Sequence, residues 1–263
     1  MVRLHVVRRA HLAPLIRTLQ STSEIEASRR SLQRRGLSSL GSAQLLPWQL
    51  LYAARFIARP LQVDAIKSWD VDSAIRLIER HVPDRDASIL DMGCFNSEVV
   101  YALHAAGYRN VHGIDLNPRC EWMPYWHRIQ YRTGDLTRSG YATGAFQAIT
   151  CLSVVEHGVD VAALAAEARR LLTPGGILVV TTDFDVRGGH SGHAGLTPFG
   201  LHWRIFDPTS IRKLISVFAA AGLGLLEGGR EADLVHDSCP IQWNGERYTF
   251  LLLVFRAGAA RVS

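Results

Sequence analysis

Short apolar runs alternate along the chain with segments of helical periodicity. Five runs have the length of strands that are buried on both faces, and turn-forming residues bound them. They cover residues 88–92, 110–115, 129–133, 148–153 and 176–182. Amphipathic or glycine-terminated segments separate them, as expected for helices that connect parallel strands. This alternation predicts an α/β fold with a mostly parallel sheet and helices on both faces.

One helix and two strands are predicted after the last of these runs. The helix begins at the cap Asp207-Pro208-Thr209-Ser210 and ends before Gly222. Residues 223–227 and 248–255 are the two strands. They lie next to each other along the chain without an intervening helix, so one of them is expected to run antiparallel.

Two helices are predicted before the sheet. Residues 45–57 place Trp48, Tyr52 and Phe56 on one stripe, which indicates a core-facing helix, a lid over a ligand site or a homodimer surface. The second helix ends at His81 and follows Asp70-Val71-Asp72-Ser73, which is expected to cap its N-terminus.

Positive charge is concentrated at the start of the chain. The formal net charge is +5, but residues 1–40 contain eight arginines and only two acidic residues, so the remainder is close to neutral. A basic isoelectric point therefore describes the first segment and gives little support to nucleic-acid binding by the rest. We expect a partly ordered basic arm and helical extension over residues 1–69 and a folded domain over residues 70–263.

The composition also restricts the setting of the protein. The four cysteines form no C-x-x-C pair, which disfavours a structural zinc site or a disulfide framework and favours a reducing compartment. No apolar run reaches the roughly 18 residues of a membrane-spanning helix. The first residues lack the apolar stretch of a signal peptide. We therefore expect a cytoplasmic protein without a transmembrane segment.

Acidic residues stand where the first two parallel strands end. Asp91 lies in the first strand just before Gly93, and Asp115 ends the second. Open parallel sheets bind ligands outside the carboxyl ends of their strands, and a carboxylate after the second strand suits a ribose diol. The turn after the first strand lacks G-x-G-x-x-G and adds the negative charge of Glu98, which disfavours a phosphate. A nucleoside with a cationic group is the better match.

These motifs resemble those of a known family. Leu90-Asp91-Met92-Gly93-Cys94 and Gly113-Ile114-Asp115-Leu116 resemble motifs I and II of class I S-adenosylmethionine-dependent methyltransferases, and Ser153-Val154-Val155-Glu156-His157 resembles their S-V-x-E-H segment. The resemblance covers residues 70–256. It implies a Rossmann-like seven-stranded sheet in the order 3-2-1-4-5-7-6 with only the last strand antiparallel. S-adenosylmethionine would be the cofactor and S-adenosylhomocysteine the product.

The resemblance also implies a set of cofactor contacts. Asp115 would bind the ribose hydroxyls, Asp91 the methionyl amino end and Asp135 the adenine amino group. Phe95 and Ser97 stand where the family has glycines, so we expect Ser97 and Glu98 to contact the cofactor through their side chains. The expected cofactor residues are Asp91, Gly93, Cys94, Phe95, Ser97, Glu98, Asp115, Leu116, Asp135, Leu136 and Ser153.

The loops after the fourth and fifth strands hold the candidates for chemistry. His157 is expected to accept a proton from an acceptor hydroxyl, with Glu156 and His202 as further catalytic candidates, and a purely structural histidine is the competing interpretation. Asp183 and Asp185 are candidate ligands of a divalent cation such as Mg²⁺ that would polarise a substrate diol.

The expected activity is O-methylation of a small hydroxylated acceptor. A sugar or glycan precursor of polysaccharide biosynthesis is favoured because polar and aromatic residues fall in residues 183–206 and 229–247, two loops that the family's topology places beside the cofactor. Two alternatives stay open. One is an RNA-directed methyltransferase guided by the basic arm, although the chain has no Asn-Pro-Pro-Tyr-like motif. The other is a non-catalytic binder that retains the fold.

Overall fold

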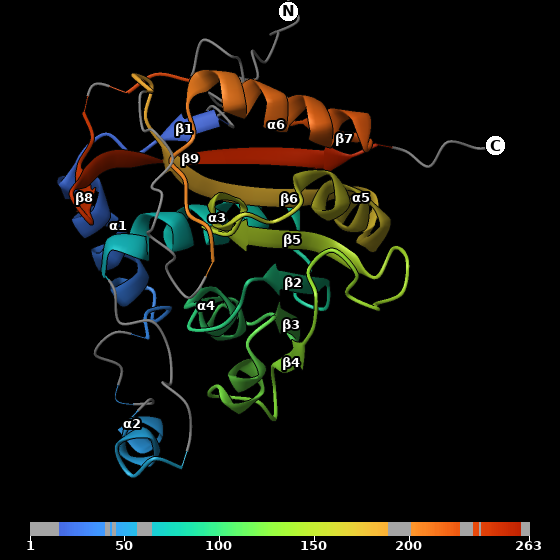
Figure 1. Cartoon of the computed structure of the whole chain (residues 1–263). Coiled ribbons are helices and arrows are strands. Elements are labelled where there is room, and N and C mark those ends of the chain that lie inside the picture. Colours follow the sequence, from blue (N-terminus) through green and yellow to red (C-terminus); the bar gives the residue numbers. More distant parts are fainter. Residues whose placement is uncertain are drawn as a thin grey trace, which may run out of the picture.

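A computed structural model of the chain describes residues 16–39, 43, 46–56, 65–188, 201–226, 234–236 and 238–258. Within these ranges a twisted sheet separates two helical layers (Figure 1). One layer contains α1 (Thr22–Arg34), α3 (Ser68–His81) and α4 (Val99–Ala105), and the other contains α5 (Val161–Leu171) and α6 (Pro208–Ala220). Each layer buries its own hydrophobic cluster against one face of the sheet, as the continuous apolar runs of the strands require.

The sheet contains the predicted seven strands. They are β2 (Ser88–Met92), β3 (Asn110–Asp115), β4 (Gln130–Thr133), β5 (Phe146–Leu152), β6 (Leu172–Phe184), β7 (Leu223–Leu225) and β9 (Glu246–Ala257). Their order is β4-β3-β2-β5-β6-β9, with β7 beside β9. Strands β2 to β6 are parallel and β9 pairs antiparallel with β6. The seven predicted strands keep the relative order 3-2-1-4-5-7-6 within a sheet of nine strands among the described residues.

Two short strands were not predicted, and both pair with β9. Strand β1 (Ile16–Thr18) lies along the same edge of β9 as β7, with Ile16 opposite Leu253. Strand β9 is much longer than β7, so its edge still offers unpaired backbone groups, and β1 covers part of that edge. Strand β8 (Ile241–Trp243) forms a hairpin with the start of β9 through Asn244 and Gly245, which both have positive φ angles.

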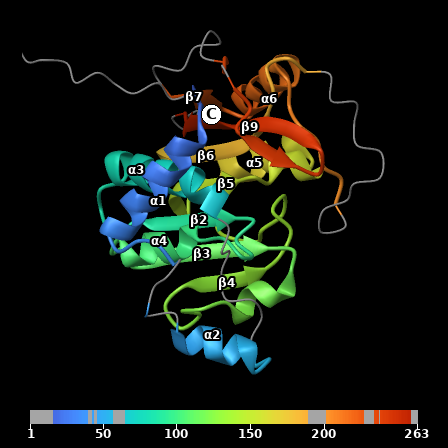
Figure 2. The ribbon, with the colours of Figure 1, turned by 90° about the vertical axis from the view of Figure 1, so that its left-hand side faces the viewer.

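Residues 16–39 are part of the packed fold. Helix α1 lies against α3 (Figure 2), and β1 extends the sheet beside β9 (Figure 1). The expectation of a partly ordered arm is therefore wrong for these residues, because Ile25 and Leu32 are buried in the core. Residues 1–15 of the predicted arm lie outside the described residues. The domain boundary between residues 69 and 70 stays a prediction.

The start of α3 differs from the prediction. The helix begins at Ser68, after the one-turn 3-10 helix η2 (Ala65–Lys67), so Asp70 and Asp72 lie inside its first turns and do not cap it. Both carboxylates are instead held by tertiary contacts. Asp72 accepts hydrogen bonds from Ser31 and Arg76, and Asp70 contacts Lys67. The cap predicted for α6 is confirmed, because Asp207 and Ser210 form a reciprocal capping box.

Helix α2 (Leu46–Ala53) stands apart from both layers, at the β4 end of the molecule (Figures 1 and 2). Trp48 packs against Tyr125, with ring centroids 6.0 Å apart. The other large side chains of residues 46–56 are exposed, so the predicted core-facing stripe is wrong, whereas the lid and homodimer roles stay predictions. None of the helices in the described ranges is long and apolar enough to cross a bilayer.

Candidate active site

The carboxyl ends of β2, β3, β5 and β6 bring most of the predicted site residues to one edge of the sheet. Asp91 is buried near the end of β2, and its Oδ1 accepts a hydrogen bond from Thr150 at 2.6 Å. Its Oδ2 is buried and has no hydrogen-bond partner among the described residues. Burial raises the pKa of Asp91 to about 7, against the opposing effects of the hydrogen bond from Thr150 and of the nearby Ser97 hydroxyl. Oδ2 can therefore accept a hydrogen bond from a cationic group or an N–H group of a ligand.

The turn after β2 closes tightly although it has only one glycine. Gly93 has φ of 87°, and a Cβ atom there would lie 2.4 Å from Val154 Cγ2, so no larger residue fits. Asn96 takes the second left-handed position with φ of 60°, a conformation that asparagine tolerates better than most residues. Sequence reasoning missed Asn96. Phe95 is half-buried, and the thiol of Cys94 is buried beside Cys120.

The side chains of Ser97 and Glu98 both have hydrogen-bond partners within the protein. Ser97 Oγ accepts a hydrogen bond from the Val99 backbone N–H at 3.2 Å and so satisfies the first turn of α4. Glu98 is buried, and both of its carboxylate oxygens accept hydrogen bonds from Arg29. Ser38 and Ser39 donate to the same carboxylate. The prediction that Glu98 contacts the cofactor is not retained, because these bonds use its side chain to hold the N-terminal segment.

Asp115 ends β3 and connects two loops. Its Oδ2 accepts a hydrogen bond from the Phe95 N–H at 3.0 Å, and its Oδ1 accepts one from the Asn117 N–H at 2.8 Å. Each carboxylate oxygen has a second lone-pair direction, so a diol can still donate to this half-buried group. Leu116, directly after it, exposes most of its side chain.

Asp135 and Leu136 follow β4. Asp135 is exposed, and its Oδ1 accepts hydrogen bonds from the backbone N–H and the hydroxyl of Thr137, which lower its pKa. These bonds fix the carboxylate in an Asx turn. Leu136 is buried against the β5 side of the core. The pair is therefore rigidly placed, with Asp135 facing solvent.

A partly buried lysine, missed by sequence reasoning, lies at the ends of β5 and β6. Lys67 Nζ donates a hydrogen bond to Ser153 Oγ, lies 3.5 Å from Asp70 Oδ2 and sits 3.8 Å from the ring centroid of Phe250. Burial disfavours its charge, but Asp70, Asp183 and Glu156 outweigh burial and raise its pKa. Ser153, an expected cofactor residue, has a positive φ and is held by this lysine.

Two further carboxyl groups face Lys67. Glu156 is buried and accepts a hydrogen bond from Thr182 Oγ1 at 3.2 Å. Burial, together with the charge of Asp183, raises its pKa to about 8 despite Lys67. Asp183 accepts a hydrogen bond from Trp203 Nε1 at 2.9 Å, and burial raises its pKa to about 6. Glu156 is thus mostly protonated at neutral pH and is a poor proton acceptor there.

His157 follows Glu156 in the loop after β5, and His202 lies close to Gly158 of the same loop. Burial and the nearby charge of Lys67 lower the pKa of His157 to about 4, so its imidazole is neutral at physiological pH. Residues 202–204 run along the loop after β5: the Arg204 N–H donates to the Glu156 carbonyl at 3.1 Å, and a Cβ on Gly158 would lie 3.2 Å from His202 Cβ. His202 itself is exposed.

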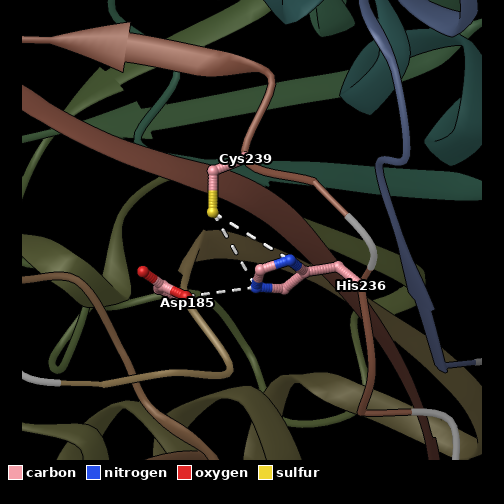
Figure 3. A group of neighbouring side chains, drawn as sticks. All are labelled: Asp185, His236 and Cys239. Atoms are coloured by element: carbon pink, nitrogen blue, oxygen red, sulfur yellow. Dashed lines mark hydrogen bonds and ion pairs between the residues drawn. The ribbon is translucent and has the colours of Figure 1, made fainter.

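The two predicted metal ligands belong to different clusters. Asp183 faces Trp203 and the positive charge of Lys67, whereas Asp185 contacts Arg187 and His236. Cys239 completes the group around Asp185 (Figure 3). The shared site expected for the two aspartates is therefore not formed among the described residues, because a lysine already balances the charge near Asp183.

Comparison with known proteins identifies the fold. Residues 90–180 match a family model described as a methyltransferase domain. Residues 90–180 therefore belong to a methyltransferase domain, and the fold around them is the class I methyltransferase fold. The chain shares this fold with the S-adenosylmethionine-dependent methyltransferase of Mesorhizobium loti, with a TM-score of 0.50 at 20% identity over 72% of this chain and 96% of that one. S-adenosylmethionine is the cofactor of this class. The half-buried Asp115 and the buried Oδ2 of Asp91, which accepts no hydrogen bond within the described ranges, fit it.

Curated relatives of the methyltransferase domain carry the name ubiquinone biosynthesis O-methyltransferase. The one from Thiobacillus denitrificans is 28% identical over 117 residues, which is 41% of this chain and 49% of the relative. The chain thus spans about half the length of the curated relatives it matches. The same fold occurs in the 4+2 cyclase SpnF, with a TM-score of 0.53 at 17% identity over 89% of this chain and 97% of that one. The fold alone therefore does not define the reaction.

Proposed function

We propose that this protein transfers a methyl group from S-adenosylmethionine to a hydroxyl group of a small acceptor. The observation that carries the proposal is the buried Oδ2 of Asp91 at the end of β2, which has no hydrogen-bond partner among the residues that the structure describes. A buried acceptor without a partner is costly for the folded protein unless a ligand supplies the donor. The neutral imidazole of His157 at the same edge supplies a proton acceptor for the hydroxyl.

The cofactor would be held by residues at the ends of β2, β3 and β4. When bound, S-adenosylmethionine supplies an electrophilic methyl group. Asp91 would accept from its amino end, Asp115 would bind its ribose hydroxyls, and Leu116 would lie against its adenine ring. Asp135 is the proposed partner of the adenine amino group. Gly93 and Asn96 keep the turn close to the sheet, so the backbone leaves room beside Asp91.

The weak basicity of His157 favours an acidic acceptor hydroxyl. Its pKa is about 4. A phenol such as that of tyrosine titrates near 10, and delocalisation of the phenolate charge into the ring makes it more acidic than an aliphatic hydroxyl. The proton of a phenol is therefore easier to remove than that of a sugar hydroxyl. We propose a phenolic ring as the acceptor, which agrees with the name of the relatives. The carbohydrate acceptor expected from the sequence gains no support from them.

Nucleic acid is the weaker alternative acceptor. Four arginines of the N-terminal segment are ion-paired with acidic side chains of the protein: Arg17, Arg29, Arg30 and Arg35. These ion pairs partly neutralise the arginine charges, which reduces the attraction of the N-terminal segment for a phosphate backbone.

The test measures S-adenosylhomocysteine formation from S-adenosylmethionine and a simple dihydroxybenzene, with methyl glucoside as the comparison acceptor. We expect turnover on the phenol only. His157→Ala should lower kcat by about 100-fold or more while the affinity for S-adenosylhomocysteine stays unchanged. Asp115→Ala should instead weaken cofactor binding. Full turnover in His157→Ala would remove His157 as the base, and a wild-type protein that binds no S-adenosylhomocysteine would overturn the proposed function.

A further inference from the structure

Three potential metal ligands of different chemistry converge next to the proposed site. Asp185 follows β6, and His236 and Cys239 come from the connection between β7 and β9 (Figure 3). Their ligand atoms all lie within 4.8 Å of one another. The side chains of Asp185 and His236 are almost completely buried, with relative exposures of 2% and 3%. The segments that meet here are far apart in sequence, so the cluster is a product of the tertiary fold.

The distances in this cluster are close to those of a tetrahedral zinc site. With Zn–N and Zn–O bonds of about 2.0 Å and a Zn–S bond of about 2.3 Å, tetrahedral angles place nitrogen and oxygen ligands about 3.3 Å apart and sulfur and nitrogen ligands about 3.6 Å apart. In the structure, His236 Nε2 lies 3.3 Å from Asp185 Oδ1 and 4.0 Å from Cys239 Sγ. Only a small movement of the cysteine is needed.

We propose that Asp185, His236 and Cys239 bind a divalent transition metal ion, with zinc as the best match. A thiolate, an imidazole and a carboxylate form a donor set that suits zinc and disfavours Mg²⁺, which prefers oxygen ligands. Three protein ligands leave a fourth position for water or for a substrate oxygen. This differs from the predicted Mg²⁺ site, because Asp185 takes part without Asp183.

Arg187 now provides the positive charge in the cluster. Its guanidinium donates to Asp185 Oδ2 at 2.9 Å and to Cys239 Sγ at 3.1 Å. Its side chain is 66% exposed, so it can turn into solvent when a metal ion takes its place. The anionic groups are thus already arranged around a cation. Arginine and metal compete for the same carboxylate and sulfur atoms.

Two existing bonds are replaced when the metal binds: the S–H bond of Cys239 and the hydrogen bond that His236 accepts. The Cys239 thiol releases its proton to solvent as the sulfur–metal bond forms, because thiolate is the ligating form. His236 Nε2, which accepts a hydrogen bond from the Val186 N–H at 2.8 Å, gives up that bond and coordinates the metal, while Nδ1 carries the proton. No electron is transferred and no further reactant is needed.

Zinc binding to the full chain tests the proposal without any methyl acceptor, so its outcome is independent of the proposed function. Chelator-treated protein is titrated with Zn²⁺ against a competing indicator, and bound metal is counted by elemental analysis. We expect one equivalent. Asp185→Asn, His236→Gln and Cys239→Ser should each weaken binding by about 10-fold or more, whereas the control Cys120→Ser should leave it unchanged.

Arg187→Gln separates metal ligation from loss of structure. This variant removes a competing cation and keeps all three ligands, so Zn²⁺ should bind more tightly than to the wild-type chain. Replacement of Zn²⁺ by Co²⁺ should give a thiolate-to-metal absorption band that Cys239→Ser abolishes. A wild-type chain that binds no Zn²⁺, or a Cys239→Ser chain with wild-type affinity and the same cobalt spectrum, would overturn the proposal.

Discussion

Lys67 shows why a single side chain can decide what a site is able to bind. It is one of two lysines in a chain that otherwise uses arginine, and it lies among Asp70, Glu156 and Asp183. An ammonium is a compact point charge, whereas a guanidinium is a broad planar fork. The compact group fits between Ser153 and the ring of Phe250. The acidic groups at the ends of β5 and β6 therefore have an internal counter-charge.

Asp91 is expected to make cofactor binding dependent on pH. Its pKa is about 7 because it is buried, and its ionised form attracts the cofactor's amino group. As the pH rises from 6 to 8 the carboxyl group loses its proton, so binding of S-adenosylhomocysteine should tighten by about tenfold. Calorimetric titration at pH 6, 7 and 8 measures this.

The matched variants separate Asp91 from the rest of the cofactor site. Asp91→Asn should bind more weakly and with little pH dependence. Asp115→Ala should also bind more weakly but keep the wild-type slope, because Asp91 is intact. An Asp91→Asn chain with the wild-type slope would show that another group is titrating.

The sequence predicted individual residues well where a strand end dictates their position. Asp91 and Asp115 lie at the sheet edge because parallel strands end there, and Glu156, His157 and His202 are neighbours. The protein partners of Glu98 and Asp185 were not predicted, since Arg29 and His236 lie 69 and 51 positions away in the chain. Such pairings arise from tertiary packing, and no local sequence pattern predicts them.

Among the helices and strands, too, those set by the local sequence were predicted and those set by tertiary packing were not. The strands at 88–92 and 110–115 were predicted to the residue, because both are apolar runs closed by turns. Strand β1 has only three residues, one of them arginine, and becomes a strand because β9 offers an open edge. Helix α3 begins at Ser68, ahead of the predicted cap at Asp70, and the Asp70 carboxylate contacts Lys67 instead of capping the helix.

The ion pair between Arg29 of α1 and Glu98, just before α4, should contribute strongly to the stability of the fold. Arg29 and Glu98 have side-chain exposures of 10% and 5%. Removal of one partner leaves a buried charge uncompensated, so Arg29→Ala should lower the free energy of unfolding by about 3 kcal/mol. Urea unfolding followed by circular dichroism measures the change.

Helix α1 also supplies the control for this prediction. Arg30 and Glu26 form an ion pair on the same helix with side-chain exposures of 58% and 69%. Solvent screens this pair, so Arg30→Ala should cost less than about 1 kcal/mol. Equal losses in the two variants would mean that Arg29 does not act through its buried partner.

For the whole molecule, the buried acidic side chains should make the free energy of unfolding fall as the pH rises. The pKa of Glu156 is about 8 in the folded protein against an ordinary value of 4.5, because the group is buried near Asp183, with Lys67 and Arg204 as the facing cations. As the pH rises, the folded state therefore keeps this proton to a higher pH than the unfolded state does. Its contribution is full below pH 4.5 and is lost as the pH rises to about 8.

A substitution that cannot titrate tests this directly. The unfolding free energy of the wild-type chain should fall between pH 5 and pH 9, and Glu156→Gln should remove on the order of a few kcal/mol of that decrease. Asp91 contributes in the same direction, so part of the slope remains. The exposed variant Glu26→Gln should follow the wild-type curve. Parallel curves for wild type and Glu156→Gln would assign the decrease to other groups.

The bonds from Arg29, Ser38 and Ser39 to Glu98 link two regions that the sequence separates. Glu98 ends the turn that follows β2, and its partners belong to the N-terminal segment. Docking of that segment and ordering of the turn are therefore coupled equilibria. By thermodynamic reciprocity, a ligand that orders the turn tightens the docking by the same factor as docking tightens the ligand. Proteolysis after residue 39 would then report on cofactor occupancy from a distance.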